Sequence, residues 1–233
     1  MLEIESLKRQ LLEALQAVGF AKGKDDYEKS SSNSENVNLI KSIIFAGLNP
    51  NIVKVNLPDA KYDKILSGTV EREKEAKEIK FYTKDDGRVF IHPSSMLFSV
   101  KNYSPPFLTY FSKMATSKTF LRDGTEIPLY AILLFGGMVK VDHHNRGLSV
   151  GNDNWIKMRA WARIGTLVHQ LRWLLNSLLD AKIEDPSLEG KHGYNLSFPS
   201  LMISRTNANT HLSTVTTSPI IDAMLKLIST DGM

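Results

Sequence analysis

Hydrophobic residues near the start of the chain recur at the spacing of an α-helix. They lie three or four positions apart with charges between them and predict a helix that ends at Gly19, and they are Leu2, Ile4, Leu7, Leu11, Leu12, Leu15 and Val18. Residues 22–38 are polar and serine-rich, which predicts a loop, and a second helix is expected over about 37–46. Neither short helix can bury its apolar face alone. We therefore interpret residues 1–48 as the end of a helical domain.

From residue 51 to about 141 the apolar period changes to two. Short runs rich in β-branched and aromatic residues predict strands at 51–56, 78–83, 88–92, 107–114, 117–123 and 128–135. Asp85, Asp86 and Gly87 predict a hairpin turn between two of these strands. The mixed charges at 71–78 predict a solvated loop or a short helix. Several short strands this close together indicate a small OB-like barrel over residues 49–145.

Helical spacing returns after residue 152. Asn152, Asp153 and Asn154 offer an N-cap, and the apolar residues that follow predict one helix over 155–182. The pair Asp185-Pro186 predicts its end. Residues 187–218 predict mostly loop, and 219–229 predict a last short helix.

These patterns together predict an α+β fold. A small OB-like β-barrel is flanked by helices, with a long C-terminal helix in residues 146–186 and a mostly irregular tail in 187–233.

Composition narrows the classes of function. The net charge is +4 and the pI is near 9.1, a mild basic bias that suits an anionic partner. There is no cysteine, which excludes disulfides, thiolate nucleophiles and cysteine-ligated zinc. No apolar run reaches the roughly 18 residues of a membrane span, and the charged, amphipathic start is unlike a signal peptide. We therefore expect no membrane partner and a cytoplasmic or nuclear location, with the cytoplasm favoured.

Two stretches resemble ligand sites only in part. The string GFAKGKD at 19–25 lacks the spacing and the hydroxyl residue of a phosphate-binding loop. His143 and His144 are adjacent, and adjacent histidines rarely share one metal ion. A solvated loop is the better interpretation of that pair, and no metal site is predicted.

The string RVFIHPSS at 88–95 raises the question of a serine nucleophile. His92 and Ser94 lie on the same side of an extended chain, but we expect them to be several ångströms apart and see no orienting acid. The favoured interpretation is structural: Pro93 ends a strand, while Ser94 or Ser95 caps the next turn. No catalytic residue is predicted.

Basic and aromatic residues interleave between Lys80 and Arg122. Seven basic residues stand against two acidic ones in this stretch, with aromatic rings among them. An OB barrel that carries both residue types is a recurring binder of single-stranded nucleic acid. Many of the rings must also fill the barrel, so composition alone leaves a structural role open.

Five strings stand in order along the chain: FAGLNPNIVKVN (45–56), IHPSS (91–95), FLTYFSKMATSKTFLRDGTEIP (107–128), LLFGG (133–137) and the segment from NDNW to DPSL (152–188). Together they resemble the C-terminal part of DEAH-box RNA helicases, and the RNA helicase A-like branch in particular. The resemblance covers about residues 35–188. Gly124 departs from this resemblance, because many relatives carry a β-branched residue at that position. The glycine predicts a slightly looser strand there.

The resemblance implies an accessory role. In the family an OB-fold domain follows the helical ratchet-like domain, contributes RNA contacts at the exit of the RNA channel and docks activators. The two motor domains, with their Walker A loop, DEAH box and arginine finger, are absent from this sequence. We therefore expect no cofactor here, with ATP and magnesium bound by the motor domains of the parent helicase, and a chain that is inactive by itself.

Two functions remain from the sequence. The first is binding of RNA, expected to be single-stranded, in support of ATP-dependent unwinding. The predicted phosphate contacts are Lys80, Arg88, Lys113, Lys118 and Arg122, and the predicted stacking faces are Tyr82 and Tyr110. The alternative is a protein-interaction module that docks an activator or a ribosomal component without RNA affinity of its own. An exposed Trp161 or Trp173 would favour this alternative.

Overall fold

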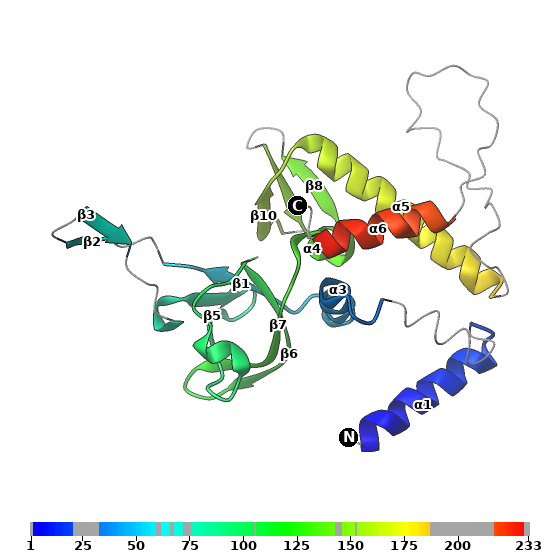
Figure 1. Ribbon diagram of the computed structural model, residues 1–233, viewed down its shortest axis with the longest axis horizontal. Coiled ribbons are helices and arrows are strands. Elements are labelled where there is room, and N and C mark those ends of the chain that lie inside the picture. The colour runs from blue at the N-terminus through cyan, green and yellow to red at the C-terminus, as the bar shows by residue number, and fades with distance from the viewer. Residues whose placement is uncertain are drawn as a thin grey trace. The chain divides into compact units, whose positions relative to one another are not determined.

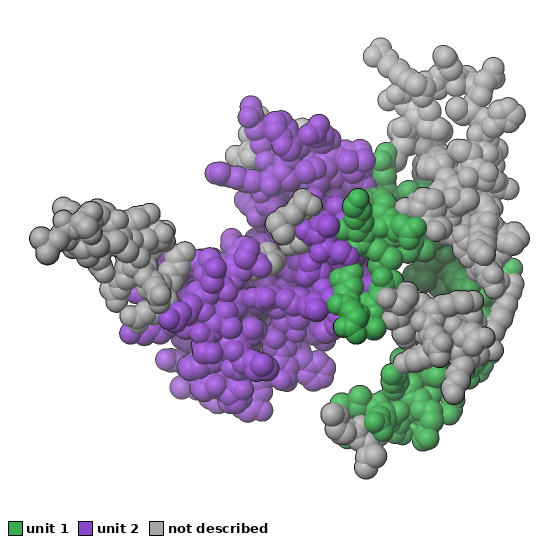
Figure 2. Space-filling view, viewed as in Figure 1, with its two compact units in different colours: residues 1–36, 169–226 green, residues 37–168, 227–233 purple. Residues whose placement is uncertain are grey.

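The computed structural model contains two compact units, which are drawn in different colours in Figure 2. One comprises residues 1–36 and 169–226, and the other comprises residues 37–168 and 227–233. The structure describes residues 2–20, 33–58, 62–65, 68–71, 76–104, 106–142, 146–151, 153–186 and 217–230.

The predicted barrel is confirmed in the larger unit (Figure 1). Its strands are β1 (Ile52–Asn56), β4 (Lys80–Thr83), β5 (Gly87–Ile91), β6 (Phe107–Ala115) and β7 (Thr119–Glu126), closed in the order β1-β4-β5-β7-β6. The pair β5 and β7 is parallel, and the other neighbours are antiparallel. Gly87 has a φ of 68° where β5 begins, a conformation that glycine adopts without strain and that the predicted hairpin turn requires.

Alternate residues of these strands fill the barrel. Val53, Val89, Leu108 and Leu121 are all at most 2% exposed and belong to one cluster of buried side chains. Because successive side chains of a strand point to opposite faces, the residues between them face outward. This parity decides which of the basic and aromatic residues are available to a ligand.

Short elements fill the connections of the barrel. The hairpin β2 (Tyr62–Ile65) and β3 (Gly68–Glu71) was not predicted, and η1 (Ala76–Glu78) provides the short helix expected near the charge run. A second 3-10 helix, η2 (Met96–Ser99), follows β5.

The strand predicted at 128–135 is wrong, because this stretch forms the helix α4 (Leu129–Phe135). Pro128 is its N-cap, and Ala131, Ile132, Leu133 and Leu134 are all buried. A helix that is buried on most sides has no polar face, so its sequence lacks the period that would distinguish it from a buried strand.

The start predicted for the long helix is also wrong. Residues Ile156–Arg159 form the strand β10, which pairs with β9 (Gly147–Val150), and β9 pairs with β8 (Val139–Asp142). The helix α5 begins later and spans Ala162–Glu184. Asn154, predicted as part of a cap, has a φ of 52° and accepts a hydrogen bond from the Ser149 hydroxyl at 2.9 Å, so it turns the chain into β10.

The remaining helices agree with the predicted pattern. They are α1 (Leu2–Ala17), α3 (Val37–Leu48) and α6 (Thr217–Thr230). Phe45 of α3 is fully buried, and Lys41 of α3 forms an ion pair with Glu126 of β7 at 3.1 Å. Helix α3 therefore packs with the barrel in one unit, while the domain boundaries proposed from the sequence stay a prediction. None of the described helices has the length and the apolar character needed to cross a membrane.

Candidate nucleic-acid interface

Neighbouring strands of the barrel place a row of basic and aromatic side chains on its outside. Tyr82 of β4 lies opposite Arg88 of β5, and Phe90 of β5 lies opposite Phe120 of β7. Directly opposed residues of paired strands share a face. Lys80 and Arg122 extend the same face, because each lies two positions from a member of the row on its own strand. We call this surface the cation–aromatic face and define it as Lys80, Tyr82, Arg88, Phe90, Lys118, Phe120 and Arg122.

Phe90 lies at the centre of this face. The Lys118 ammonium is 4.8 Å from the centroid of the Phe90 ring, and the Arg88 guanidinium carbon is 5.1 Å from it. The Phe120 ring lies beside it, with the two centroids 6.1 Å apart at an interplanar angle of 48°. Both cations are therefore within cation–π distance of one half-buried ring. Two adjacent aromatic rings and two positive charges are held together by the register of β5 and β7.

The charges of this face are not neutralised by the part of the chain that the structure describes. Lys80, Arg88, Lys118 and Arg122 are exposed and form no ion pair with a described residue. Basic side chains without acidic partners leave a positive potential at the surface, which attracts phosphates.

Lys113, also predicted as a phosphate contact, is placed differently. Its Nζ donates a hydrogen bond to Asp86 Oδ2 at 2.7 Å. This hydrogen bond raises the pKa of Lys113 and lowers the pKa of Asp86. An ion pair that is already formed must be broken or shared before Lys113 can contact a phosphate.

Tyr110, predicted as a stacking face, lies in the barrel interior. It is 7% exposed and belongs to the buried cluster with Leu108 and Leu121. Burial raises the pKa of its phenol. A ring with so little exposed area offers no face to a base, so Tyr110 is left out of the interface that we consider below.

The segment after β5 confirms the structural interpretation of the RVFIHPSS string. The Ser95 hydroxyl accepts a hydrogen bond from the Leu97 backbone N–H at 3.3 Å and caps η2. The expected gap between His92 and Ser94 is wrong, since His92 Nδ1 and Ser94 Oγ are 2.6 Å apart. The same Nδ1 accepts the Ser94 backbone N–H at 3.2 Å. No described carboxylate contacts His92, so the pair forms a turn and not a catalytic constellation.

Sequence reasoning missed Phe90 and Phe120 as site residues. Both were counted among the interleaved aromatics, but their direction could not be assigned without the register of the strands. The available signal was parity: Phe90 lies two positions after Arg88, and Phe120 lies two positions before Arg122, so each shares a face with a predicted basic residue.

No other described cluster suggests a catalytic or metal centre. Groups of histidine, aspartate or glutamate able to hold a metal ion are absent from the described residues. His143 and His144 lie outside those residues.

Lys84 forms an ion pair with Asp153, and this contact raises the pKa of Lys84. Trp161 is 66% exposed, whereas Trp173 is half-buried.

Comparison with known proteins identifies two regions of the chain. Residues 40–139 match the oligonucleotide/oligosaccharide-binding (OB) fold, and residues 149–194 match the C-terminal domain in RNA helicases. The first region contains the barrel with the whole cation–aromatic face. The second contains β10 and α5.

The curated relatives are helicases that are much longer than this chain. A putative DEAH-box ATP-dependent helicase of Mycosarcoma maydis is 42% identical over 79% of this chain and 13% of its own length. The human ATP-dependent DNA/RNA helicase DHX36 is 35% identical, over 78% of this chain and 17% of its own. The human putative ATP-dependent RNA helicase DHX57 is 37% identical, over 80% of this chain and 15% of its own length. The chain thus carries the OB-fold and C-terminal domains of DEAH-box helicases, and it corresponds to the C-terminal region of that family.

Proposed function

We propose that the cation–aromatic face binds single-stranded RNA as an accessory surface of an ATP-dependent helicase. The observation that carries the proposal is the placement of Arg88 and Lys118 at 5.1 Å and 4.8 Å from the ring of Phe90. Surfaces that bind single strands without sequence preference combine cations for the phosphates with rings for the bases. The face contains both within a few ångströms.

The cations supply the sequence-independent part of this binding. Lys80, Arg88, Lys118 and Arg122 neutralise phosphates and release counterions, so affinity falls as salt concentration rises. Their lack of ion pairs within the described chain supports this role, because no described carboxylate has to be displaced before they contact a phosphate.

The rings favour unpaired bases. Phe90 and Phe120 lie side by side with centroids 6.1 Å apart, and Tyr82 is half-buried on the neighbouring strand. A base in a single strand can place its flat face on such a ring, whereas the bases of a duplex are already stacked on one another. His92 extends this surface, since its ring meets Phe120 edge-on with centroids 6.0 Å apart.

The relatives' names support the helicase context of this role. They describe ATP-dependent DNA/RNA or RNA helicases, and this chain spans only 13–17% of the relatives cited above. In our proposal, ATP and magnesium are bound by motor domains outside this sequence, and the chain acts on RNA together with those domains in the cytoplasm or the nucleus, with the cytoplasm favoured.

The test is a salt titration of binding to a fluorescent single-stranded RNA. The double variant Arg88→Ala, Lys118→Ala is expected to bind at least about tenfold more weakly at low salt. The slope of log affinity against log salt should fall by about 1.4, since each phosphate contact to a single strand contributes about 0.7. The matched control is Arg9→Ala, Lys157→Ala, which removes the same charge from exposed residues outside the barrel. Equal slopes for the double variant and the wild type would overturn the proposal.

One observation favours the second candidate, a protein-interaction module. Trp161 is 66% exposed, which is the condition that the sequence set for this alternative. Large exposed aromatic residues are enriched where proteins bind one another. The two functions use different surfaces, so one chain is able to carry both.

A further inference from the structure

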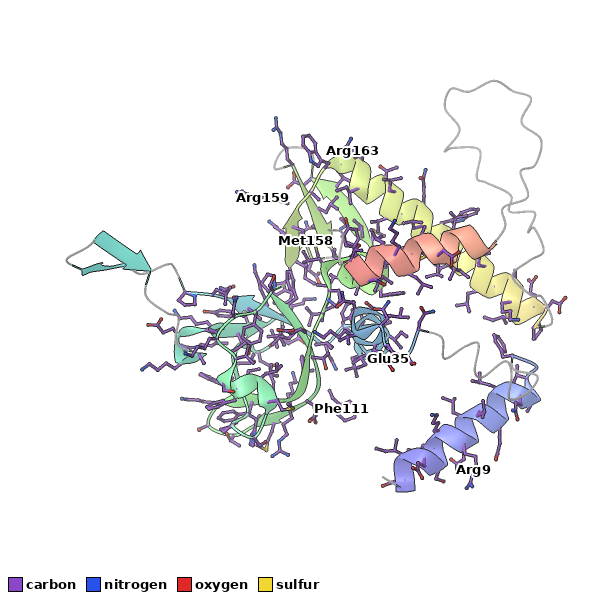
Figure 3. The ribbon with its side chains drawn as sticks, in the orientation of Figure 1. Arg9, Glu35, Phe111, Met158, Arg159 and Arg163 are labelled. Atoms are coloured by element: carbon purple, nitrogen blue, oxygen red, sulfur yellow. The ribbon has the colours of Figure 1, made fainter. Side chains whose placement is uncertain are left out.

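A largely apolar groove lies between α4, β10 and the start of α5. Its volume is about 390 Å³, in the size range of ligand-binding pockets. Leu129 and Leu133 of α4, Met158 of β10 and Ile164 of α5 line it with aliphatic and thioether side chains. Figure 3 labels Met158 and Arg159 on β10 and Arg163 at the start of α5.

Trp161 also lines this groove, in the link between β10 and α5. Two-thirds of its surface is exposed, although indole is among the most costly side chains to leave in water. The guanidinium carbon of Arg163 is 5.7 Å from the Trp161 ring centroid. This cation–π contact holds an arginine at the indole and places a positive charge beside the groove.

Further arginines surround the apolar lining. Arg146 and Arg159 line the groove, and both are exposed, as is Arg163. No carboxylate is among the lining residues, and none of the three arginines forms an ion pair with a residue that the structure describes. The groove therefore combines an apolar interior with a positive surround.

We propose that this groove docks an acidic amphipathic peptide segment of a partner protein. Apolar side chains of the segment occupy the space beside Trp161, Leu133 and Ile164, and its carboxylates pair with Arg146, Arg159 and Arg163. Arginine forms bidentate pairs with carboxylates, and tryptophan and arginine are the residues most often found at the energetic centres of protein interfaces. The charge complementarity selects acidic segments over basic ones.

The composition of the lining favours a peptide over RNA in this groove. Leucine, isoleucine and methionine side chains present no flat face on which a base could stack. The aromatic residues of the lining are Trp161 and Tyr130. The cation–aromatic face has the opposite balance, with rings and cations on a strand surface. This inference is independent of the proposed RNA binding; it rests on the second candidate function, the protein-interaction module, and names the class of partner.

The probe is a fluorescein-labelled synthetic peptide of roughly 15 residues, with leucine and phenylalanine at helical i, i+3, i+4 and i+7 positions and glutamate elsewhere. Anisotropy is measured with the full 233-residue chain. We expect saturable binding that weakens about tenfold or more in Trp161→Ala and in Arg159→Glu. Two altered peptides, one with serine in place of the apolar residues and one with lysine in place of glutamate, should bind at least about tenfold more weakly.

Matched variants separate this proposal from the RNA-binding one. Arg88→Glu, on the cation–aromatic face, should leave peptide affinity within about twofold, and Trp161→Ala should leave RNA affinity within the same range. Circular dichroism checks that each variant is folded. We expect Trp161→Ala to fold, because the Trp161 side chain is mostly exposed. Absence of peptide binding, or equal binding by wild type and Trp161→Ala, overturns the docking proposal whatever the RNA result. Loss of RNA affinity in Trp161→Ala without peptide binding would also overturn it and assign the groove to RNA.

Discussion

Lys113 Nζ donates a hydrogen bond to Asp86 Oδ2 at 2.7 Å, which links the end of the β4–β5 turn to β6. Lys113 and Lys118 were equal candidates in the sequence, but only Lys118 lies over Phe90 without an acidic partner in the described chain. We expect Lys113→Ala to lower RNA affinity by less than about twofold and Lys118→Ala to lower it about threefold or more. Parallel anisotropy titrations at one salt concentration measure both. A larger effect for Lys113→Ala would contradict the assignment.

The same ion pair predicts a pH dependence of stability. The hydrogen bond from Lys113 lowers the pKa of Asp86, so the folded state favours the ionised carboxylate. This stabilisation is present above the unfolded pKa of about 3.9 and is lost as the pH falls through the lower folded pKa. Asp86→Asn should therefore lower the free energy of unfolding by less than about 1 kcal/mol at pH 7, because the pair is partly exposed. Urea titrations at neutral and strongly acidic pH check this, and a difference that grows at acidic pH would contradict it.

The buried Tyr103 leads us to expect a loss of stability at alkaline pH. Its hydroxyl donates to the Leu97 carbonyl at 2.8 Å, the residue is 2% exposed, and burial raises its pKa to about 12. A raised pKa means that the protonated phenol stabilises the fold fully below the unfolded pKa of about 10, and that this stability is lost as the pH rises toward 12. Tyr103→Phe should cost about 1 kcal/mol at pH 7 from the lost hydrogen bond.

Ultraviolet titration of tyrosinate tests the Tyr103 prediction. Burial raises the pKa of both Tyr103 and Tyr110, so fewer phenols should ionise near pH 10 in the wild type than the tyrosine content requires. Tyr103→Phe should remove the step near pH 12. If the variant and the wild type show the same late ionisation, the raised pKa belongs to another tyrosine.

The absence of a side chain at Gly165 lets α5 approach the three-stranded sheet closely, and substitution of this glycine tests that packing. A Cβ added there would lie 2.8 Å from both Leu148 Cδ2 and Val141 Cγ2. Alanine in an open helix position gains up to about 1 kcal/mol over glycine, but here the clash should reverse the sign and lower Tm. Gly47→Ala in α3 is the matched control, because nothing lies within 4 Å of its Cβ position. Stabilisation by both substitutions would contradict the packing of α5 on β8 and β9.

The barrel was predictable because its strands alternate on a half-buried surface. Val53 and Val55 alternate with Lys54, and Phe81 and Thr83 with Tyr82. The helix α4 and the strand β10 could not be assigned in this way. α4 is buried on most sides and has no polar face, while the apolar residues of β10 also fit the helical spacing that continues into α5.

The site could be predicted only as far as residue type. A basic and aromatic content indicates a class of ligand, but the direction of each side chain depends on strand register. Tyr110 and Phe90 are both aromatic residues of predicted strands, yet one fills the barrel and the other faces outward between two cations. The partner of Lys113 is Asp86, which lies 27 residues away in the turn between β4 and β5. Such a long-range contact leaves no local signal in the sequence.

Ultraviolet cross-linking of single-stranded RNA to the wild-type chain tests the central claim most directly. Mass spectrometry of the tryptic digest locates the cross-linked peptides. The cation–aromatic face predicts that they are the peptides 89–101 and 119–122, which contain Phe90 and Phe120. Excess unlabelled single-stranded RNA should abolish these cross-links, and duplex RNA should compete poorly. Cross-links confined to β10 and α5, or none in the barrel, would contradict the account.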